Sequence, residues 1–378
     1  MNALKIPFNR PSFVGREREY MDEALALGQV SGDGEFTRRC SALLRDQLGT
    51  PAALLTTSCT HALELAAILL DIAPGDEVII PDFTFVSTAN AFVLRGAKPV
   101  FADIRPDTLN LDERQVERLV GPKTRAIVPV HYAGVGCAMD VLLDLARSRG
   151  IAVVEDNAHG LFGTWRGKPL GTFGALGALS FHETKNFSCG EGGALLVNDA
   201  RLVDRAEIVR EKGTNRKRFF RGEVDRYTWV DVGSSYLPSD LLAAYLYGQL
   251  EQKAEVLGRR RRVYERYLEG LSSWAQDRGV QLPTIPSDCA SSYHMFYAIL
   301  PTPDARARLI AGLRERGILS VFHYLPLHLS EMGRRWGGRA GDCPVTESVS
   351  ERLVRLPFYT SLSEEDQERV IEAVRAVR

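Results

Sequence analysis

Apolar runs of strand length alternate with longer helical patterns through the first two-thirds of this 378-residue chain. Such alternation is typical of strand–helix units around a mostly parallel sheet, because each parallel strand needs a crossover connection to the next. The runs are continuously apolar, which indicates strands buried on both faces. The expected strands cover residues 77–81, 98–104, 124–130, 151–155, 175–182 and 193–198, with helices at 88–95 and 140–149.

The pattern changes at about residue 239. A long helical pattern then continues to about residue 272, and its consecutive arginines at 259–262 are interpreted as a solvated helix face. Beyond it we expect strands at 293–300 and 318–324 and helices at 305–316 and 364–378, the last capped by Ser363. The sequence therefore predicts an N-terminal arm and large domain over 1–245, and an interdomain helix with a small C-terminal domain over 246–378.

The charges of the chain nearly cancel, because 47 Lys and Arg face 48 Asp and Glu, a formal net charge of −1. A chain without a basic excess is not expected to bind nucleic acid or an anionic membrane as its main partner. No apolar stretch approaches the roughly 18 residues that a membrane span needs. The first residues also lack the apolar segment of a signal peptide, so we expect a cytoplasmic globular protein.

The six cysteines are widely separated, with no C-x-x-C pair and no histidine at metal-ligand spacing. In a long chain this pattern favours reduced thiols over a disulfide framework. A zinc enzyme would need clustered ligands. His323 and His328 are therefore interpreted as pocket or core histidines, and no metal site is expected.

Several segments carry residue types suited to cofactor chemistry, and each also has an ordinary structural interpretation. The hydroxyl-rich turn at 56–60 includes Ser58 and Cys59 and leads into an amphipathic helix. The N-terminus of that helix suits a phosphate, and the alternative is a simple N-cap. Asp156 follows a buried strand, at the edge where parallel sheets place ligands, and the alternative is a turn or capping residue.

Lys185 follows another expected strand and precedes a glycine-rich turn at 190–193. A desolvated lysine there suits Schiff-base chemistry, whereas the alternative is a solvated loop lysine. Phe85 directly follows a strand and suits either stacking on a planar cofactor or the core. Pyridoxal phosphate needs a phosphate cradle, an aromatic platform, a carboxylate for its pyridine nitrogen and a lysine for its aldehyde. The chain supplies all of these at strand ends, which favours that cofactor.

Longer motifs carry a resemblance to a known family: GDEVIIPDFTFVSTANA, PVHYAG, VVEDNAHG, SFHETKNFSCGEGG, REKGTNR and VDVGSSYLPSDLLAAYL. With them the sequence resembles the sugar aminotransferases of the DegT/DnrJ/StrS family, from about Ile6 through HYLPLH and beyond. The resemblance implies an α/β protein of the type I pyridoxal-phosphate-dependent transferase fold, similar to aspartate aminotransferase. That fold has a large, mostly parallel mixed-sheet domain and a smaller C-terminal α/β domain.

The resemblance also implies roles for the matching residues. Lys185 forms the Schiff base with pyridoxal 5'-phosphate and moves protons, with pyridoxamine phosphate as the intermediate. Asp156 keeps the pyridine nitrogen protonated. Ser58, Cys59 and Ser180 bind the phosphate.

Further cofactor contacts are implied at positions where the chain partly departs from its relatives. Phe85 covers the ring face, as in the family. Ser235 stands where many relatives carry an asparagine that reaches the phosphate from the partner subunit. His159 replaces the usual glutamine and hydrogen-bonds near the phenolic oxygen of the cofactor, and the alternative is a packed core histidine.

The segments REKGTNR, FFRG and GSSYLPSD resemble those of family members that form dTDP-4-amino-4,6-dideoxygalactose. The implied reaction moves an amino group from L-glutamate to C4 of a dTDP-linked 4-keto-6-deoxyhexose, in a homodimer with shared active sites. Candidates for lining the sugar pocket are His131, Tyr132, His323, Tyr324 and His328. Arg216 and Arg221 are candidates for binding the nucleotide diphosphate, and the alternative is surface charge in a loop.

Other activities compete with this one. Amination at C3, or of another nucleotide keto-sugar, keeps the same chemistry. A dehydratase of the family carries histidine in place of the lysine, so Lys185 argues against it. A non-catalytic pyridoxal-phosphate-binding regulator would need a helix-turn-helix or a basic domain, and a serine hydrolase would need a G-x-S-x-G elbow; the sequence shows neither pattern.

Overall fold

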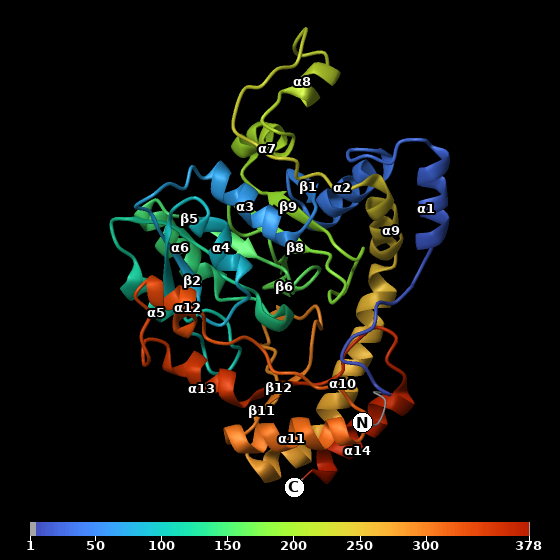
Figure 1. The fold of residues 1–378 in the computed structure, drawn as a ribbon, viewed down its shortest axis with the longest axis vertical. Coiled ribbons are helices and arrows are strands. Elements are labelled where there is room, and N and C mark those ends of the chain that lie inside the picture. The colour runs from blue at the N-terminus through green and yellow to red at the C-terminus, as the bar shows by residue number, and fades with distance from the viewer. Residues whose placement is uncertain (1–4, 378) are drawn as a thin grey trace.

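A seven-stranded sheet forms the centre of the computed structural model, which describes residues 5–377 (Figure 1). Its strands, in the order β1-β9-β8-β5-β4-β2-β3, are β1 (Ala52–Thr56), β9 (Gly193–Val197), β8 (Leu176–Ser180), β5 (Ala152–Asp156), β4 (Thr124–Ile127), β2 (Glu77–Pro81) and β3 (Lys98–Ala102). β9 runs antiparallel to β1 and β8, and the remaining neighbours pair in parallel. The predicted mostly parallel mixed sheet is confirmed.

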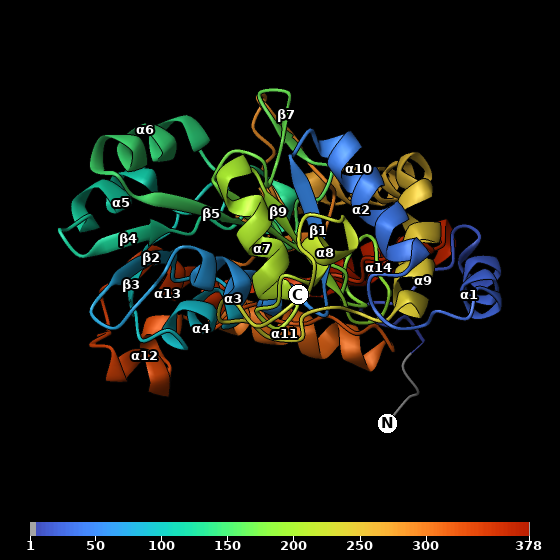
Figure 2. The same cartoon turned by 90° about the horizontal axis from the view of Figure 1, so that it is seen from above.

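Helices cover both faces of this sheet (Figure 2). They are α2 (Glu35–Leu48), α3 (Cys59–Leu69), α4 (Ser87–Val93), α5 (Glu113–Leu119), α6 (Met139–Arg149), α7 (Val203–Arg210) and α9 (Asp240–Glu251). α3, α4 and α7 share one apolar cluster with the sheet. On the opposite face, α2 and α9 pack over β1, while α5 and α6 pack over β4 and β5. The continuously apolar strands are thus buried on both sides.

A second core lies at the end of the molecule that is lowest in Figure 1. There β11 (Tyr297–Ile299) and β12 (Leu353–Arg355) pair antiparallel, packed against α10 (Lys253–Arg278), α11 (Pro303–Glu315) and α14 (Glu364–Ala376). Ile6 from the N-terminal arm joins the same cluster. A division of the chain at residue 245 stays a prediction, and that residue lies within α9.

The remaining elements are short or peripheral. They are α1 (Glu17–Ala26), α8 (Arg216–Phe220), α12 (Glu331–Arg335), α13 (Pro344–Arg352), β6 (Thr164–Trp165), β7 (Lys168–Pro169), β10 (Cys289–Ala290) and 3-10 turns at Tyr132–Gly134, Ala200–Leu202 and Leu327–Leu329. Within residues 5–377, no helix is both long and apolar enough to cross a membrane.

The C-terminal third differs from the sequence prediction in its strands. The expected strand at 293–300 shortens to β11, because Tyr293 has a φ of 53°, which a strand does not accept. The expected strand at 318–324 reduces to isolated bridges, from Ile318 to Ile6 and from Val321 to Arg355. Its two ends thus pair with different segments, so no continuous ladder forms.

The arginine run was also interpreted wrongly at one position. Arg260 is only 2% exposed, and its guanidinium donates to the carbonyl oxygens of Tyr293 (2.9 Å) and His294 (2.6 Å) and to Thr360 Oγ1 (3.3 Å). Successive residues of a helix advance by about 100°, so a run of this length cannot share one solvated face. Arg260 therefore joins α10 to the segment that precedes β11.

We expect Arg260→Leu to lower the free energy of unfolding by about 3 kcal/mol, because two backbone carbonyls would lose their buried donor. The matched control is Arg261→Leu, since Arg261 pairs with Glu265 on the exposed face and its loss should cost less than about 1 kcal/mol. Urea unfolding of both variants measures the difference. Equal losses of unfolding free energy in the two variants would show that the buried hydrogen bonds of Arg260 stabilise the fold no more than an exposed ion pair does.

Candidate active site

The predicted cofactor residues come together at the carboxyl edge of the parallel strands. Ser58 follows β1, Asp156 ends β5, Ser180 ends β8, and Lys185 lies in the loop after β8. β9 starts at the same edge, where Gly193 pairs with Ser180. Ligand sites of parallel α/β sheets occupy this edge, because successive strands deliver their following loops to one place.

A cradle suited to phosphate lies at the start of α3. Ser58 caps this helix, with its Oγ accepting from the backbone N–H of His61 at 3.1 Å. Gly193 lies against the same turn, where a Cβ atom would stand 2.3 Å from the carbonyl carbon of Ser58. Glycine is therefore needed there for β9 to lie this close. Cys59 begins α3, and burial raises the pKa of its thiol, so it stays uncharged beside the free helix N–H groups.

The carboxylate of Asp156 is 5% exposed and firmly held. Oδ2 accepts from Thr88 Oγ1 at 2.7 Å and Oδ1 from the N–H of Ala158 at 3.2 Å. Burial raises the pKa of Asp156, whereas these two bonds and the charge of Lys185 lower it. A carboxylate in this setting fits a protonated ring nitrogen, which would replace the solvation lost on burial. Thr88 was not predicted, although it lies in the hydroxyl-containing segment that follows β2.

Lys185 is a desolvated amine. Burial lowers its pKa to about 8, an effect partly opposed by the charge of Asp156 and strengthened by that of Arg355. With this pKa an appreciable minority of the amine is neutral at physiological pH and half of it is neutral near pH 8, and only the neutral form is a nucleophile or a base. Arg355, in β12, is a second residue near the site that the sequence did not reveal.

His159 stands beside these groups with an unused hydrogen-bonding atom. Its ring stacks on that of His294, with 4.3 Å between centroids. Burial, followed by the charge of Lys185, lowers the pKa of His159, so the ring is neutral. Its Nδ1 is buried and has no hydrogen-bond partner within residues 5–377. An orphaned polar atom of this kind fits a ligand oxygen, as the resemblance implies for the cofactor.

An aromatic wall continues from His159 toward the small sheet. The Tyr132 hydroxyl forms a hydrogen bond with Nδ1 of His323 at 2.6 Å, and the ring of His323 stacks on that of Tyr324, with 3.6 Å between centroids. Burial lowers the pKa of His323, so this ring is also neutral. Phe85 lies 6.5 Å from Tyr324 and remains 57% exposed. The structure therefore brings these predicted pocket residues together.

His131, by contrast, belongs to a buried hydrogen-bond network. Its Nε2 lies 2.8 Å from Glu155, and its Nδ1 accepts from the N–H of Cys137 at 3.2 Å. Glu155 also accepts from backbone N–H groups of Gly171 and Gly174. Both ring nitrogens of His131 are thus engaged, which differs from the predicted contact with a sugar.

His328 likewise differs from its predicted place in the sugar pocket. The ring is fully buried, with Nδ1 2.6 Å from Asp82 and Nε2 3.0 Å from Glu347. Potential ligand atoms of Asp82, His328 and Cys343 lie within 4.8 Å of one another. Carboxylates thus lie at both ring nitrogens of His328, and these contacts join the end of β2 to α13.

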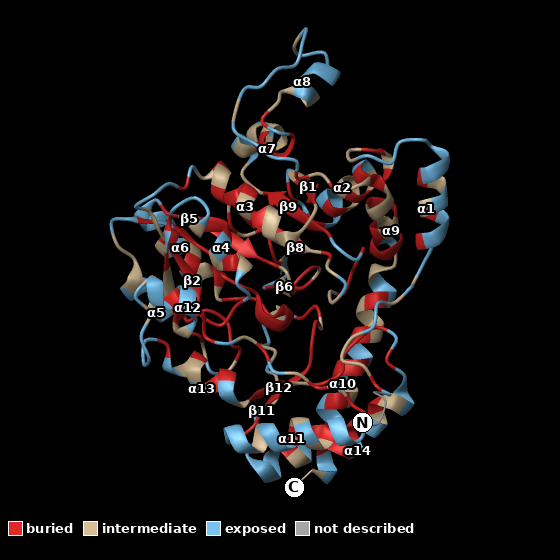
Figure 3. Cartoon of the chain, in the orientation of Figure 1, coloured by how far each residue is buried: buried red, intermediate tan, exposed pale blue. Residues whose placement is uncertain are grey.

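Arg216, Arg221 and Ser235 lie on the segment 213–235, which contains α8 and stands apart from the body of the molecule (Figures 1 and 3). Arg221 pairs with Glu207 at 2.7 Å and with Glu223 at 2.6 Å. Arg216 and Ser235 are exposed. Within one chain, these residues are not gathered around Lys185.

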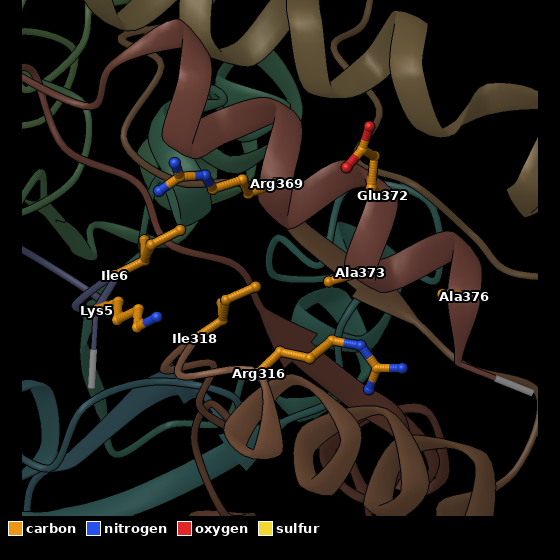
Figure 4. Close-up of a pocket in the computed structure, with 8 residues that line it drawn as sticks. All are labelled: Lys5, Ile6, Arg316, Ile318, Arg369, Glu372, Ala373 and Ala376. Atoms are coloured by element: carbon orange, nitrogen blue, oxygen red, sulfur yellow. The ribbon is translucent and has the colours of Figure 1, made fainter. Parts of the chain in front are cut away.

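A cavity lies elsewhere, away from these residues. Its volume is about 410 Å³, and it lies between the N-terminal arm and α14 (Figure 4). It is lined by Lys5, Ile6, Arg316, Ile318, Arg369, Glu372, Ala373 and Ala376. The predicted site residues do not line it, so it is separate from the strand edge that carries Lys185.

The comparison with known proteins agrees with this geometry. Residues 11–375 match the profile of the DegT/DnrJ/EryC1/StrS aminotransferase family. The chain belongs to this family. Pyridoxal phosphate is the cofactor of this aminotransferase, and the predicted type I fold is confirmed.

Its relatives match it over nearly their whole length. The spore coat polysaccharide biosynthesis protein SpsC of Bacillus subtilis is 33% identical over 380 residues, which cover 98% of this chain and 97% of SpsC. A GDP-perosamine synthase of Escherichia coli O157:H7 is 30% identical over 370 residues, 98% and 97% of the two chains. The putative sugar aminotransferase Spr1654 of Streptococcus pneumoniae has been solved in PMP and PLP forms. Its PMP form superposes on this chain with a TM-score of 0.92 at 28% identity, over 99% of both chains.

We expect Gly193→Ala to weaken pyridoxal phosphate binding at least about tenfold, because the new Cβ would force α3 away from β9. Gly121→Ala is the matched control, since a Cβ there meets nothing closer than an oxygen of Glu77 at 4.0 Å. Titration of each apoprotein with the cofactor, followed by absorbance, gives the two affinities. If Gly193→Ala binds pyridoxal phosphate as tightly as the wild type, Gly193 is not part of the phosphate cradle.

The apoprotein should capture pyridoxal phosphate faster as the pH rises, with a midpoint near 8, because Lys185 must lose its proton before it attacks the aldehyde. An ordinary lysine would place that midpoint near 10.4. Stopped-flow absorbance between about pH 6 and 10 measures the rate. A rate still rising steeply above pH 9 would contradict the lowered pKa.

Proposed function

We propose that this aminotransferase moves an amino group from L-glutamate to C4 of a dTDP-linked 4-keto-6-deoxyhexose, giving dTDP-4-amino-4,6-dideoxygalactose. The observation that carries the proposal is that Ser58, Asp156 and the loop of Lys185 meet at one edge of the sheet, where burial lowers the pKa of the Lys185 amine to about 8. The segments REKGTNR, FFRG and GSSYLPSD support this sugar. Among the relatives is a GDP-perosamine synthase, so another nucleotide sugar is the main alternative.

The proposed cofactor contacts follow from the site. Pyridoxal phosphate, when bound, supplies an electron sink for the negative charge that develops on the reacting carbon. Ser58, Ser180 and the N–H groups at the start of α3 hold the phosphate. Asp156 keeps the proton on the pyridine nitrogen, because a buried carboxylate favours a cation beside it. Nδ1 of His159 is free to bind the phenolic oxygen.

Lys185 is the proposed catalytic base and acid. As a neutral amine it removes the proton from the α-carbon of the donor and returns it one position away, and with the sugar it does the reverse. Its lowered pKa makes both directions accessible near neutral pH. Because the amine is buried, bulk water has little access to it during the proton transfer.

The proposed sugar pocket is formed by Tyr132, His323 and Tyr324. Burial keeps the ring of His323 neutral, so it offers one nitrogen as a donor and the other as an acceptor, and its Nδ1 pairs with the Tyr132 hydroxyl. Aromatic faces with a few neutral polar atoms suit an uncharged hexose ring. The charged diphosphate must then bind outside this wall.

We also propose a homodimer with shared active sites. The segment 213–235 exposes large apolar side chains, with Phe220 68% and Trp229 77% exposed. A protruding aromatic surface is typical of a protein contact. Arg216 and Ser235 lie on the same segment, so a second copy of the chain would bring them to its partner's site.

The homodimer is tested by Trp229→Glu, which should give a monomer and lose most activity, because a charge would be buried in the interface. Val141→Glu is the control, since Val141 is also exposed, at 47%, but lies on α6 at the other side of the sheet. Sedimentation velocity measures the assembly. A dimer that survives Trp229→Glu with full activity would place the contact elsewhere.

The reaction itself is tested with a panel of dTDP-, GDP- and UDP-linked 4-keto and 3-keto sugars, each with L-glutamate, reading 2-oxoglutarate release and the NMR spectrum of the product. We expect release with the dTDP-linked 4-keto sugar. Product from a 3-keto sugar alone would move the reaction to C3. If the protein binds the cofactor but releases no 2-oxoglutarate with any sugar, the non-catalytic regulator would be favoured.

Lys185→Ala should abolish turnover, lowering kcat by at least about 10⁴-fold, because it removes the base. Lys168→Ala is the control, since Lys168 is exposed and lies over the ring of Phe173 in the β6–β7 turn. Steady-state kinetics with the active sugar compares the two. Retained turnover in Lys185→Ala would refute the assignment.

A further inference from the structure

A short segment at 291–294, between β10 and β11, joins two loops of the site. The hydroxyl of Ser292 donates to the carbonyl oxygen of His159, in the loop after β5, at 2.5 Å. The carbonyl oxygen of Ser292 accepts from the side-chain amide of Asn186 at 2.7 Å. Asn186 directly follows Lys185 in the chain. Both bonds are buried, so the segment is anchored to the two loops that carry site residues.

His294 belongs to the same segment, and its buried ring contacts both loops. The ring stacks on that of His159, with 4.3 Å between centroids and 16° between the ring planes. Its Nδ1 lies 3.0 Å from Oδ1 of Asn186. Because the amide nitrogen of Asn186 donates to a carbonyl of the segment, its oxygen faces His294, and Nδ1 of His294 carries the proton. A directed hydrogen bond thus fixes the plane of the His294 ring.

The backbone of this segment has an uncommon conformation. Tyr293 has a φ of 53°, in the left-handed region that an aromatic residue rarely adopts. Its N–H donates to Ser291 Oγ at 2.9 Å, and the buried guanidinium of Arg260 holds the carbonyls of Tyr293 and His294. Such a conformation persists only where the surroundings enforce it, and it is found most often at functional sites. The backbone therefore points to a role for this segment beyond packing.

The stacked ring limits how the ring of His159 can turn. Nδ1 of His159 is buried and has no hydrogen-bond partner within residues 5–377, so no bond at this atom fixes the ring. The ring of His323 is a more distant neighbour, at 6.2 Å between centroids. Burial lowers the pKa of both His159 and His294, so the two rings are neutral and can lie close together. His294 is thus the nearest stacked ring that holds His159.

We propose that His294 is a positioning residue, anchored by Asn186, that orients the ring of His159 so that Nδ1 faces the phenolic oxygen of the cofactor. This inference rests on the proposed contact between His159 and that oxygen, and it names the residue on which the contact depends. A polar contact weakens when its geometry is lost, even where both partners remain. His294 acts on the cofactor through His159.

A double-mutant cycle tests this dependence. We expect His294→Ala to raise the Kd of the apoprotein for pyridoxal phosphate about tenfold, because the His159 ring would no longer be held in place. In a His159→Ala background the same change should alter the Kd less than about twofold, since the ring that it positions is gone. Titration of the four proteins with the cofactor, followed by absorbance, gives the Kd values.

A second variant and a control separate the ring from general packing. His294→Phe keeps a ring for stacking but loses the donor to Asn186, so we expect the Kd to rise about threefold. Asn198→Ala is the control, because Asn198 donates to the carbonyls of Gly171 and Gly174 at the end of β9 away from the site. It also loses buried hydrogen bonds, yet it should leave the Kd unchanged.

Visible circular dichroism of the bound cofactor gives a readout that does not depend on affinity. The signal reports how the cofactor ring is held, so at saturation His294→Ala should reduce it. The double variant should give the same signal as His159→Ala alone. If His294→Ala weakens binding equally with and without His159, the effect is a general loosening of the fold and the inference is wrong.

The outcomes separate this inference from the proposed function. If His159→Ala binds the cofactor as tightly as the wild type, the proposed contact of His159 fails, and the inference fails with it. If His159→Ala weakens binding but both His294 variants bind as the wild type does, the inference alone is overturned. A wild type that completes the cycle as expected but transfers no amino group to any sugar would overturn the proposed function and leave the inference intact.

Discussion

The rest of the site depends on burying an amine next to a buried carboxylate. Lys185 and Asp156 both lose solvation at the carboxyl edge of the sheet, and burial moves their pKa values toward the neutral forms in each case. Their mutual attraction opposes that shift. The balance leaves an amine whose pKa is lowered to about 8 and a carboxylate whose charged form is favoured by Thr88, a backbone N–H and Lys185 against the effect of burial. A cofactor with a cationic ring and an aldehyde relieves both costs.

The sheet topology makes this pair possible. β5 and β8 are adjacent and parallel, so the loops that follow them begin at one edge, and β9 returns antiparallel beside β8 to close the cradle against α3. The side of β5 that faces away carries Glu155, which binds His131 and three backbone N–H groups. Asp156 and Glu155 are adjacent in β5 but have different partners, because successive side chains of a strand face opposite sides of the sheet.

The sequence predicted the site residues whose position depends only on their neighbours along the chain. Ser58, Asp156 and Lys185 follow apolar runs, and a strand followed by a polar loop is visible in the sequence. Contacts between distant segments were missed or misassigned for the opposite reason. His328 stands in a motif with His323, yet its partner Asp82 is at the end of β2, and nothing local shows that the two are paired. Arg355 reaches the site only because β12 packs against it.

An active site that binds both an amino acid and a sugar needs a charged group for the first and an uncharged surface for the second. An amino acid brings a carboxylate to the reacting carbon, whereas a hexose brings hydroxyl groups and a ring. Here the histidines of the wall are neutral because burial opposes their protonation, and Nδ1 of His323 is paired with the Tyr132 hydroxyl. A wall of this kind accepts the hexose without leaving a charge unpaired.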